Sequence, residues 1–258
     1  MTIRKAIRGL SSQELERFRD AISRTKALSD ERGYNFFAGL HGLPLPSYCQ
    51  HGTLLFLPWH RAYLYFLELA LQDQVPGVGF PYWDWTSTVS HQEGLPTAYA
   101  QEQQDDGAEN PLFSSTVEWP RELIDLVLER LPGTITAEGR TLRDPDPPDE
   151  LPRRATIDSI LKAPTFEDFS IRLENVHGDV HVWVGGAMSQ VATAAYDPVF
   201  WAHHTMIDRL WYLWQIGPFG MDPPASLMQQ ALPPFPITVA QTLDIQALSY
   251  DYAVQVFR

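Results

Sequence analysis

The chain has 258 residues, of which 19 are Lys or Arg and 32 are Asp or Glu, so its formal charge at pH 7 is −13. This acidic balance argues against nucleic acid or an anionic membrane surface as a partner, because both require a basic footprint on the protein. With 44% apolar residues and a single cysteine, Cys49, the composition excludes a chain that is disordered throughout and a disulfide framework.

The beginning of the sequence predicts a folded helix and no targeting segment. Its Arg and Lys residues are not followed by an apolar run, so we expect no signal peptide and a cytoplasmic protein, with export by a partner protein as the alternative. Ser11 is followed three residues later by Glu14, the pattern of a capping box, and apolar residues at helical spacing predict a helix over 12–30. Residues 42–50 contain two prolines and are predicted to be irregular.

The most hydrophobic stretch, residues 53–71, is nearly long enough to cross a bilayer. It contains His60, Arg61 and Glu68, which are costly in lipid unless they have a function. We therefore expect no membrane segment but a buried helix over 58–72 with a chemical task.

Residues from about 86 to 165 form an acidic, Pro-rich insert within a single domain that spans 1–258. The insert contains one short amphipathic helix candidate, residues 121–131. Its segments 101–110 and 143–150 carry an excess of acids, and we expect them to be solvated surface loops.

Helical patterning returns over 166–184 and again over 197–215. The second helix has Asp197 as its N-cap and a proline in its first turn. Its apolar residues are expected to face inward: Phe200, Ile207, Leu210, Trp211 and Trp214. The whole sequence therefore predicts a mostly α-helical domain.

Eight histidines decide the functional interpretation: His41, His51, His60, His91, His177, His181, His203 and His204. His177 and His181 are four residues apart in a predicted helix, which puts both imidazoles on one face, as a shared metal ion requires. Two packed histidines without a metal are the alternative. The zinc-protease motif is excluded, because no Glu directly follows the first of the two.

The adjacent pair His203 and His204 lies in the next apolar helix. A buried imidazole without a partner costs about 1–3 kcal/mol, and metal coordination is one way to supply that partner. Asp208 follows His204 by four residues and is expected to accept its ring N–H, which would fix the tautomer of a metal ligand. A structural ion pair between Asp208 and Arg209 is the alternative.

The first half of the chain offers a second trio, His41, His51 and His60. Six imidazole ligands in two groups of three favour copper, zinc or iron over calcium or magnesium, which prefer oxygen. Three neutral ligands per ion suit a pair of coppers that bind dioxygen between them. This last step rests on chemical preference and not on spacing.

Four motifs resemble the type-3 copper family of tyrosinases, catechol oxidases and molluscan haemocyanins. Residues 51–68 look like the first copper signature of that family, and the Phe-Pro-Tyr-Trp-Asp-Trp run at 80–85 resembles the motif that follows it. The His177-Gly-Asp-Val-His181 segment with residues 197–211 resembles the second signature, and Tyr250-Asp-Tyr252 looks like the tyrosines that close the core. The resemblance covers about 39–252, with the middle insert outside it.

The resemblance implies a four-helix bundle that encloses two copper ions, with long irregular loops around it. It assigns one copper to His41, His51 and His60 and the other to His177, His181 and His204, which leaves His203 packed beside them. The assignment of His41 rests on chain order, and His91 is its only substitute.

Cys49 lies two residues before His51. In fungal tyrosinases and molluscan haemocyanins, which the sequence resembles here, a cysteine at this place forms a thioether with the histidine. We therefore expect a Cys49–His51 thioether, with an inert, buried cysteine as the alternative.

The resemblance also implies oxidation of phenols or catechols by dioxygen. Glu174 resembles the family's glutamate that holds a water for removal of the phenolic proton, an ordinary surface Glu being the alternative. Gly178 stands where efficient tyrosinases have Asn, and Val182 offers substrate no charge. Both departures favour small uncharged phenols and weak hydroxylation, with Val182 and Met206 expected to form a hydrophobic rim.

The predicted function is thus a tyrosinase-like copper oxidase, with a catechol oxidase that does not hydroxylate monophenols as the first alternative. A haemocyanin-like oxygen carrier is the alternative from another class, and a zinc-loaded relative without a redox role is a further one. Because the sequence ends at Arg258, soon after Tyr252, we expect an active site without a covering C-terminal domain. A copper-delivery protein is a candidate partner.

Overall fold

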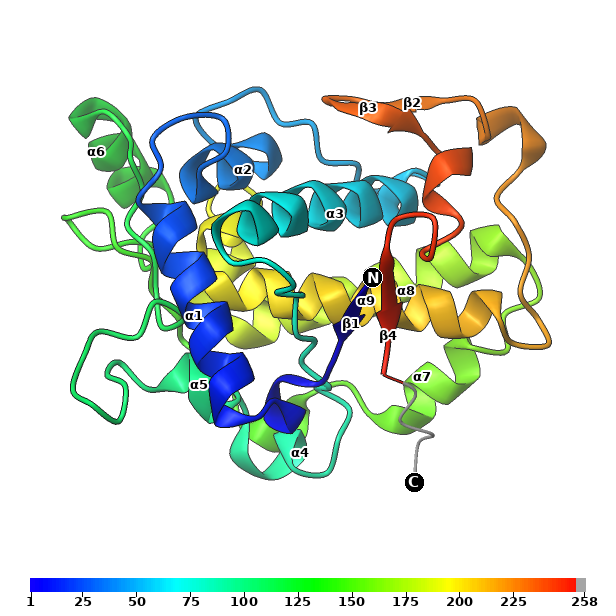
Figure 1. Ribbon diagram of the computed structural model, residues 1–258, viewed down its shortest axis with the longest axis horizontal. Helices are drawn as coiled ribbons and strands as arrows, with labels where there is room; N and C mark the ends of the chain where they lie inside the picture. The colour runs from blue at the N-terminus through cyan, green and yellow to red at the C-terminus, as the bar shows by residue number, and fades with distance from the viewer. Residues whose placement is uncertain (254–258) are drawn as a thin grey trace.

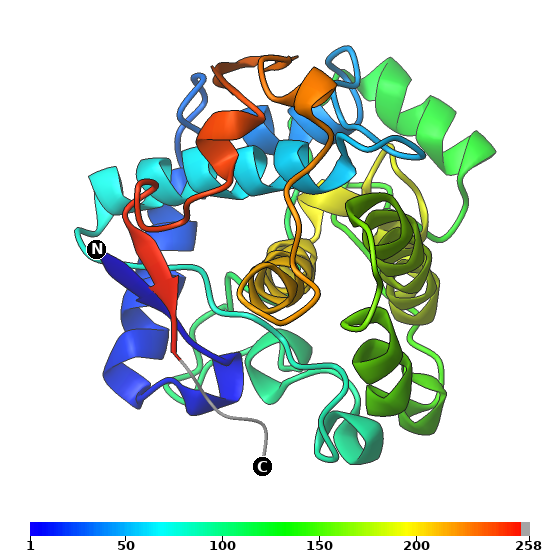
Figure 2. The same ribbon diagram turned by 90° about the vertical axis from the view of Figure 1, so that its right-hand side faces the viewer.

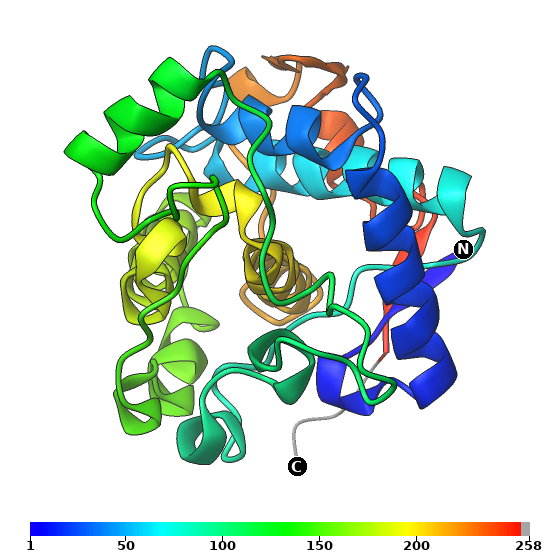
Figure 3. The same ribbon diagram turned by 90° about the vertical axis from the view of Figure 1, so that its left-hand side faces the viewer.

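Helix α9 (Pro198–Gln215) runs through the centre of the molecule (Figure 1). The structure is a computed structural model and describes residues 1–253. Seen along α9, the helices α3 (Phe56–Gln74), α8 (Phe166–Val184) and α1 (Ser12–Lys26) lie around it (Figures 2 and 3). Nearly every side chain of α9 is buried, because apolar residues occur on all of its faces, as is typical of a central helix.

Polar side chains cap the N-termini of α1, α8 and α9. Asp197 accepts a hydrogen bond from the N–H of Val199 at 2.9 Å, which confirms it as the N-cap of α9. Ser11 forms the expected capping box with Glu14 at the start of α1. At the start of α8, the side chain of Thr165, which the sequence analysis did not single out, accepts a hydrogen bond from the N–H of Asp168. Each cap satisfies a backbone N–H that has no partner within its helix.

The predicted helices over 58–72, 166–184 and 197–215 are confirmed as α3, α8 and α9, each within two residues at both ends. Helix α1 ends earlier than predicted, at Lys26. The short helix α2 (Tyr34–His41) was missed, because its residues 37–41 are all buried and show no alternation between apolar and polar faces. The expected class is confirmed: a mostly α-helical domain whose core helices α2, α3, α8 and α9 are joined by irregular segments.

Two small sheets complete the fold of residues 1–253. Strand β1 (Thr2–Arg4) pairs in parallel with β4 (Tyr250–Tyr252), with Thr2 opposite Tyr250. Strands β2 (Ala231–Leu232) and β3 (Phe235–Thr238) form an antiparallel pair. The first sheet joins the two ends of the described chain over the central helices (Figure 1).

A buried network of charges fastens this sheet to the helices. Arg4 of β1 donates to Glu68 of α3 at 2.9 Å and to Asp208 of α9 at 3.0 Å. Arg61 of α3 donates to the other oxygen of Asp208 at 2.5 Å. All four side chains are at most 3% exposed, and two positive charges face two negative ones. Since each buried charge has a partner, the network holds β1, α3 and α9 together without leaving an isolated ion.

The predicted insert packs against the core and is not only a set of loops. It contains α4 (Ser90–Glu93), α5 (Thr97–Ala100), α6 (Arg121–Arg130) and α7 (Arg154–Ile160). Residues 101–109 are mostly exposed, as expected. Several apolar side chains of the insert nevertheless belong to the hydrophobic core, among them Tyr99, Leu112, Trp119, Ile124, Ile157 and Ile160.

Segment 143–150 is mostly exposed to solvent, as expected, except for its first residue. Residues 144–150 are mostly exposed, but the side chain of Arg143 is only 8% exposed. Arg143 donates to both carboxylate oxygens of Asp197, at 2.6 and 2.7 Å. The insert is therefore attached to the residue that caps α9.

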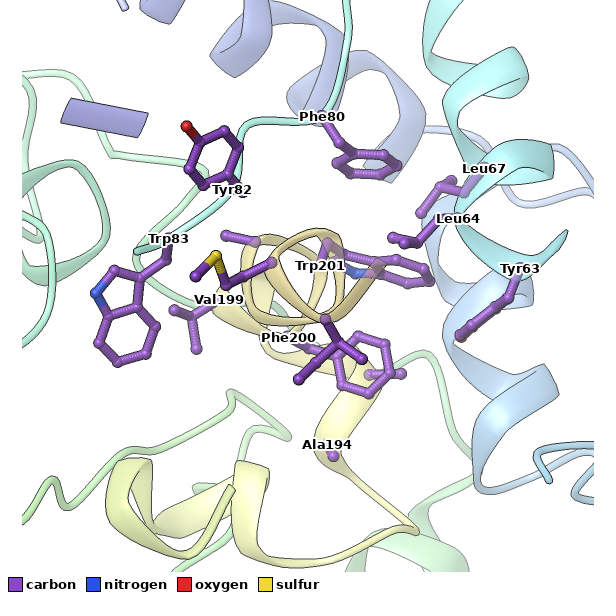
Figure 4. Packing of buried hydrophobic residues seen from close by; sticks show 14 of the residues in the cluster. Tyr63, Leu64, Leu67, Phe80, Tyr82, Trp83, Ala194, Val199, Phe200 and Trp201 are labelled. Carbon is purple, nitrogen blue, oxygen red and sulfur yellow. The ribbon is translucent and has the colours of Figure 1, made fainter. Parts of the chain in front are cut away.

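Aromatic packing holds α9 against its neighbours (Figure 4). The ring of Trp201 lies 4.7 Å from Tyr63 of α3 and is stacked at 5.8 Å on Phe80. The N–H of Trp83 donates to the carbonyl of Ala202 at 3.0 Å, so the 80–85 motif runs along the buried helix. Within residues 1–253, none of the helices combines the length and the apolar character that a bilayer span requires.

Candidate metal centre

Seven of the eight histidines gather in two groups between the core helices. In the first group, His41 is the last residue of α2, His51 lies in the irregular segment before α3, and His60 lies in α3. The second group comes from α8 and α9 and consists of His177, His181, His203 and His204. Within each group, one potential ligand atom per residue lies within 4.8 Å of all the others.

The second group converges on one point. The Nε2 atom of His204 lies 3.3 Å from Nε2 of His177 and 3.3 Å from Nε2 of His181. On their opposite sides, Nδ1 of His181 lies 2.7 Å from the carbonyl of Met188, and Nδ1 of His177 lies 3.3 Å from the carbonyl of Glu174. A carbonyl only accepts, so Nδ1 carries the proton and Nε2 presents its lone pair to the centre.

Two histidines of the first group are oriented in the same way. Nδ1 of His60 lies 2.8 Å from the carbonyl of Phe56, and Nδ1 of His41 lies 3.2 Å from the carbonyl of Val191. Their Nε2 atoms are buried and have no hydrogen-bond partner among the described residues. Since an unpaired buried nitrogen costs about 1–3 kcal/mol, a bound metal ion is the partner that this arrangement lacks.

The two groups face each other. The rings of His60 and His204 are stacked with centroids 4.6 Å apart, and the rings of His51 and His177 are 5.7 Å apart. The two potential ligand sets are therefore neighbours in the core, and each could hold one metal ion.

The imidazoles are held in the neutral form that binds metals. Burial lowers the pKa of His41, His60, His177 and His204 well below the usual value, and neighbouring histidines lower it further. For His181, burial lowers the pKa to about 4. Neutral nitrogens at pH 7 need not release a proton before they coordinate.

The expected hydrogen bond between His204 and the carboxylate of Asp208 is not formed. Both oxygens of Asp208 are used by guanidinium and phenol groups, with Tyr250 donating at 2.8 Å and Tyr252 at 2.5 Å in addition to the two arginines. Nδ1 of His204 has no hydrogen-bond partner among residues 1–253. The expected contact between Asp208 and His204 is therefore wrong, whereas the alternative pair of Asp208 with Arg209 stays a prediction. The helical spacing was right, but two buried cations attract the carboxylate more strongly than a neutral ring.

Among the described residues, the structure brings His41 and not His91 to the first group. His91 lies in α4, where its Nε2 is 3.3 Å from the carbonyl of Pro152. The expected place of His203 beside the ligands agrees with its position, since its ring is stacked on His177 at 5.2 Å. Its ligand atoms nevertheless lie within the second group.

A pocket of about 330 Å³ opens directly onto both groups. Besides histidines it is lined by Glu174, Gly178, Val182, Met188, Ser189, Val191 and Ala194. Val182 is 65% exposed at its rim, as expected, but Met206 is fully buried in α9 and does not line the pocket. The expected role of Met206 is therefore wrong. Met188 and Val191 supply the apolar surface instead, from a segment after α8 whose path the sequence analysis did not predict.

Three of the predicted pocket residues lie together on α8. Glu174 is half-buried and accepts a hydrogen bond from the N–H of Gly52 at 2.6 Å, and burial raises the pKa of its carboxyl. Gly178 faces open space, since a Cβ built there meets no other atom within 4 Å. A side chain that begins at position 178 would therefore meet no neighbouring segment with its Cβ.

Among the described residues, Cys49 does not line the pocket, but it lies two residues before His51, which does. Its Sγ is 3.0 Å from the hydroxyl of Ser47, and burial raises the pKa of the thiol. The side chain is partly buried against the hydrophobic core.

Comparisons with known proteins agree with this site. The family model described as the common central domain of tyrosinase matches residues 31–216, including the segment that the sequence analysis placed outside the resemblance. The chain is 33% identical to haemocyanin units G and H of Sepia officinalis over 226 residues, which is 83% of this chain and 37% of that protein. It is 32% identical to tyrosinase of Streptomyces lincolnensis over 246 residues, 83% of each chain.

Two solved structures show the same architecture. A functional unit of octopus haemocyanin is similar with a TM-score of 0.80 and 28% identity, covering 98% of this chain and 68% of that one. Tyrosinase from Burkholderia thailandensis gives a TM-score of 0.73 and 25% identity, covering 99% and 74%. The chain thus spans little more than a third of the length of the Sepia relative and most of the length of the Streptomyces relative.

Proposed function

The chain belongs to the family that shares the common central domain of tyrosinase, and on this premise we propose that it is a copper enzyme that uses dioxygen to oxidise small phenols. The observation that carries the proposal is the pocket, because it leads from the surface to two facing histidine groups. A site that only stored an ion would not need such an opening.

The residues present fit two copper ions. His41, His51 and His60 would hold one, and His177, His181 and His204 the other, all through neutral imidazole nitrogen. Such a donor set suits copper and disfavours calcium or magnesium, which prefer oxygen ligands. When bound, the copper pair supplies the binding and activation of dioxygen.

The protein's own part is to select, orient and deprotonate the phenol. Val182, Met188 and Val191 offer apolar contacts to an aromatic ring and no charge, which favours small uncharged phenols. Such a ring would enter with its hydroxyl toward the histidine groups. Glu174 is the carboxylate of the lining, and burial raises its pKa, which makes it a better proton acceptor than an exposed glutamate.

Gly178 shifts the balance toward catechols. A catechol gives up its protons more easily than a monophenol, so it depends less on a water that is held for proton removal. Gly178 has no side chain to hold such a water next to Glu174. We therefore expect catechol oxidation to be faster than hydroxylation of monophenols.

We also propose the thioether between Cys49 and His51. The bond would join Sγ to a ring carbon of His51, with loss of the thiol hydrogen and one ring hydrogen, and dioxygen would accept the two electrons. Intact-mass measurement on copper-loaded protein exposed to air tests this: we expect a mass lower by two hydrogens and no thiol that can be alkylated. A full mass with a reactive thiol contradicts it.

Reversible oxygen binding is the second candidate function, because haemocyanins are as similar in sequence to the chain as tyrosinases are. The two functions differ in the fate of dioxygen. We expect copper-loaded protein to consume dioxygen continuously when a catechol is present and, more slowly, with the matching monophenol. Binding of dioxygen that is fully released under vacuum, with no consumption on either substrate, would favour the carrier.

A further inference from the structure

The three histidines of the first group are not held equally. His41 is the last residue of α2, and His60 lies within α3. The Nδ1 atom of each ring is fixed by a backbone carbonyl. His51 lies in the irregular segment 42–55, and its ring makes no hydrogen bond among the described residues. It packs against the rings of His41, Phe56, His60 and His177 without a hydrogen bond to any of them. The position of His51 therefore depends on how the segment that carries it is held.

Glu174 supplies a contact at that point. Its Oε1 accepts the N–H of Gly52, the residue after His51, at 2.6 Å. Gly52 has a φ of +67°, so the chain turns there in the left-handed region that favours glycine. A hydrogen bond to a carboxylate is stronger than one between neutral groups. The bond ties the loop of the first group to the helix that carries His177, only three residues from it.

We propose that Glu174 is a positioning residue: through the backbone of Gly52 it places His51 in the first metal group and sets the first group against the second. The inference rests on the proposed function, because it assumes that the first group binds copper. The placement of His51 is a second role of Glu174, separate from the acceptance of a phenolic proton. Oε1 is occupied by Gly52, which leaves Oε2 for a water or a phenolic proton, so one carboxylate can serve both roles.

Three variants separate the two roles. In Glu174→Gln the amide oxygen can still accept from Gly52, but the proton acceptor is lost; in Glu174→Ala both are lost. Asp179→Ala removes an exposed carboxylate from the same helix and serves as the matched control, since Asp179 does not line the pocket. Each protein is loaded with two equivalents of copper(I) and challenged with a copper(I) chelator, and the release of each copper is timed.

We expect one of the two coppers to leave Glu174→Ala about 10-fold to 100-fold faster than wild type, the range typical for loss of a group that supports a metal ligand. The other copper should leave at the wild-type rate. Both coppers should leave Glu174→Gln and Asp179→Ala at rates close to wild type. Unchanged release from Glu174→Ala, or equal acceleration of both coppers, overturns the proposal.

Hydrogen exchange of the metal-free proteins provides a readout that does not depend on copper. The amides of residues 51–54 should exchange faster in Glu174→Ala than in wild type and stay protected in Glu174→Gln. Equal exchange in all proteins overturns the positioning role. Wild-type protein that holds two coppers but does not oxidise catechol would refute the proposed function and leave the positioning role standing.

Discussion

The two histidine groups are built in different ways. The second group comes from two long, packed helices, and its spacing of four residues within α8 already points to a shared ion. The first group comes from the end of the short helix α2, from a loop and from the long helix α3. The helix-borne group is positioned by the backbone of two long helices, whereas the loop-borne group depends on contacts such as the one between Glu174 and Gly52. A metal site with chemically equivalent ligands can therefore have unequal support from the fold.

The largest expected effect comes from His204→Ala, which removes the ligand on which the second group converges. Catechol oxidation should fall by more than about 100-fold, since even groups that only support ligands cost 10–100-fold in affinity or activity. Copper analysis should give one copper per chain, held by the first group. Retention of two coppers with normal activity would mean that His203 replaces His204, and the proposed ligand set would be wrong.

Asp208→Ala tests whether α9 is held by the buried charge network. Loss of this carboxylate leaves Arg4 and Arg61 without a shared partner, so the free energy of unfolding should drop by about 3–5 kcal/mol in urea titrations at pH 7. Material that still folds should bind two coppers, because Asp208 does not contact His204. Selective loss of one copper from a stable protein would instead restore Asp208 as the support of a ligand.

The same network predicts a pH dependence. Burial raises the pKa of Asp208, but Arg61 and Arg4 outweigh it, so the pKa lies below its usual value of 3.8. The unfolded chain therefore takes up the proton first as pH falls, and the contribution of the carboxylate is present at neutral pH and lost below pH 3.8. The stability difference between wild type and Asp208→Asn should shrink on acidification; a difference that grows contradicts this.

Gly178→Asn changes the pocket next to the helix-borne group. A Cβ at position 178 meets no neighbouring segment, and we expect the new amide to hold a water beside Glu174. The ratio of monophenol to catechol rates should then rise by roughly tenfold, the effect of one hydrogen bond worth about 1.4 kcal/mol. Parallel oxygen-uptake assays measure both rates. Asp179→Asn on the exposed side of the same helix is the control and should leave the ratio unchanged.

The smallest effect is expected at the rim. Val182→Arg adds a positive charge at a position that is 65% exposed. Exposed ion pairs are worth at most about 1 kcal/mol, so the KM for a catechol with a carboxylate should fall by no more than roughly fivefold, with kcat unchanged. An uncharged catechol should show no change in KM, and a similar fall for both substrates would argue against a charge effect.

The helices that carry the second group could be predicted because their signals are local. Residues 166–184 and 197–215 show apolar periodicity, and Asp197 marks the start of α9. Long-range partners could not be predicted in this way. Asp208 was assigned to His204 from helical spacing, while its actual partners include Arg4, which is 204 residues away in sequence.

The groups that surround the ligands could not be predicted from the sequence either. The acceptors behind His41 and His181 are the carbonyls of Val191 and Met188, and backbone groups leave no trace in residue type. Met206 was placed at the rim because the direction of the α9 side chains was unknown. Once α9 is central, every face of it is buried and the rim must come from the segment that follows α8.

The paired copper centre is tested by a copper titration of the metal-free protein. Bound copper is then counted, and electron paramagnetic resonance is recorded on the fully loaded copper(II) form in air. Two histidine groups whose rings approach to 4.6 Å should bind two coppers per chain and give almost no resonance signal, because the two spins couple. One copper per chain, or two coppers with the full signal of isolated ions, would contradict a paired copper centre.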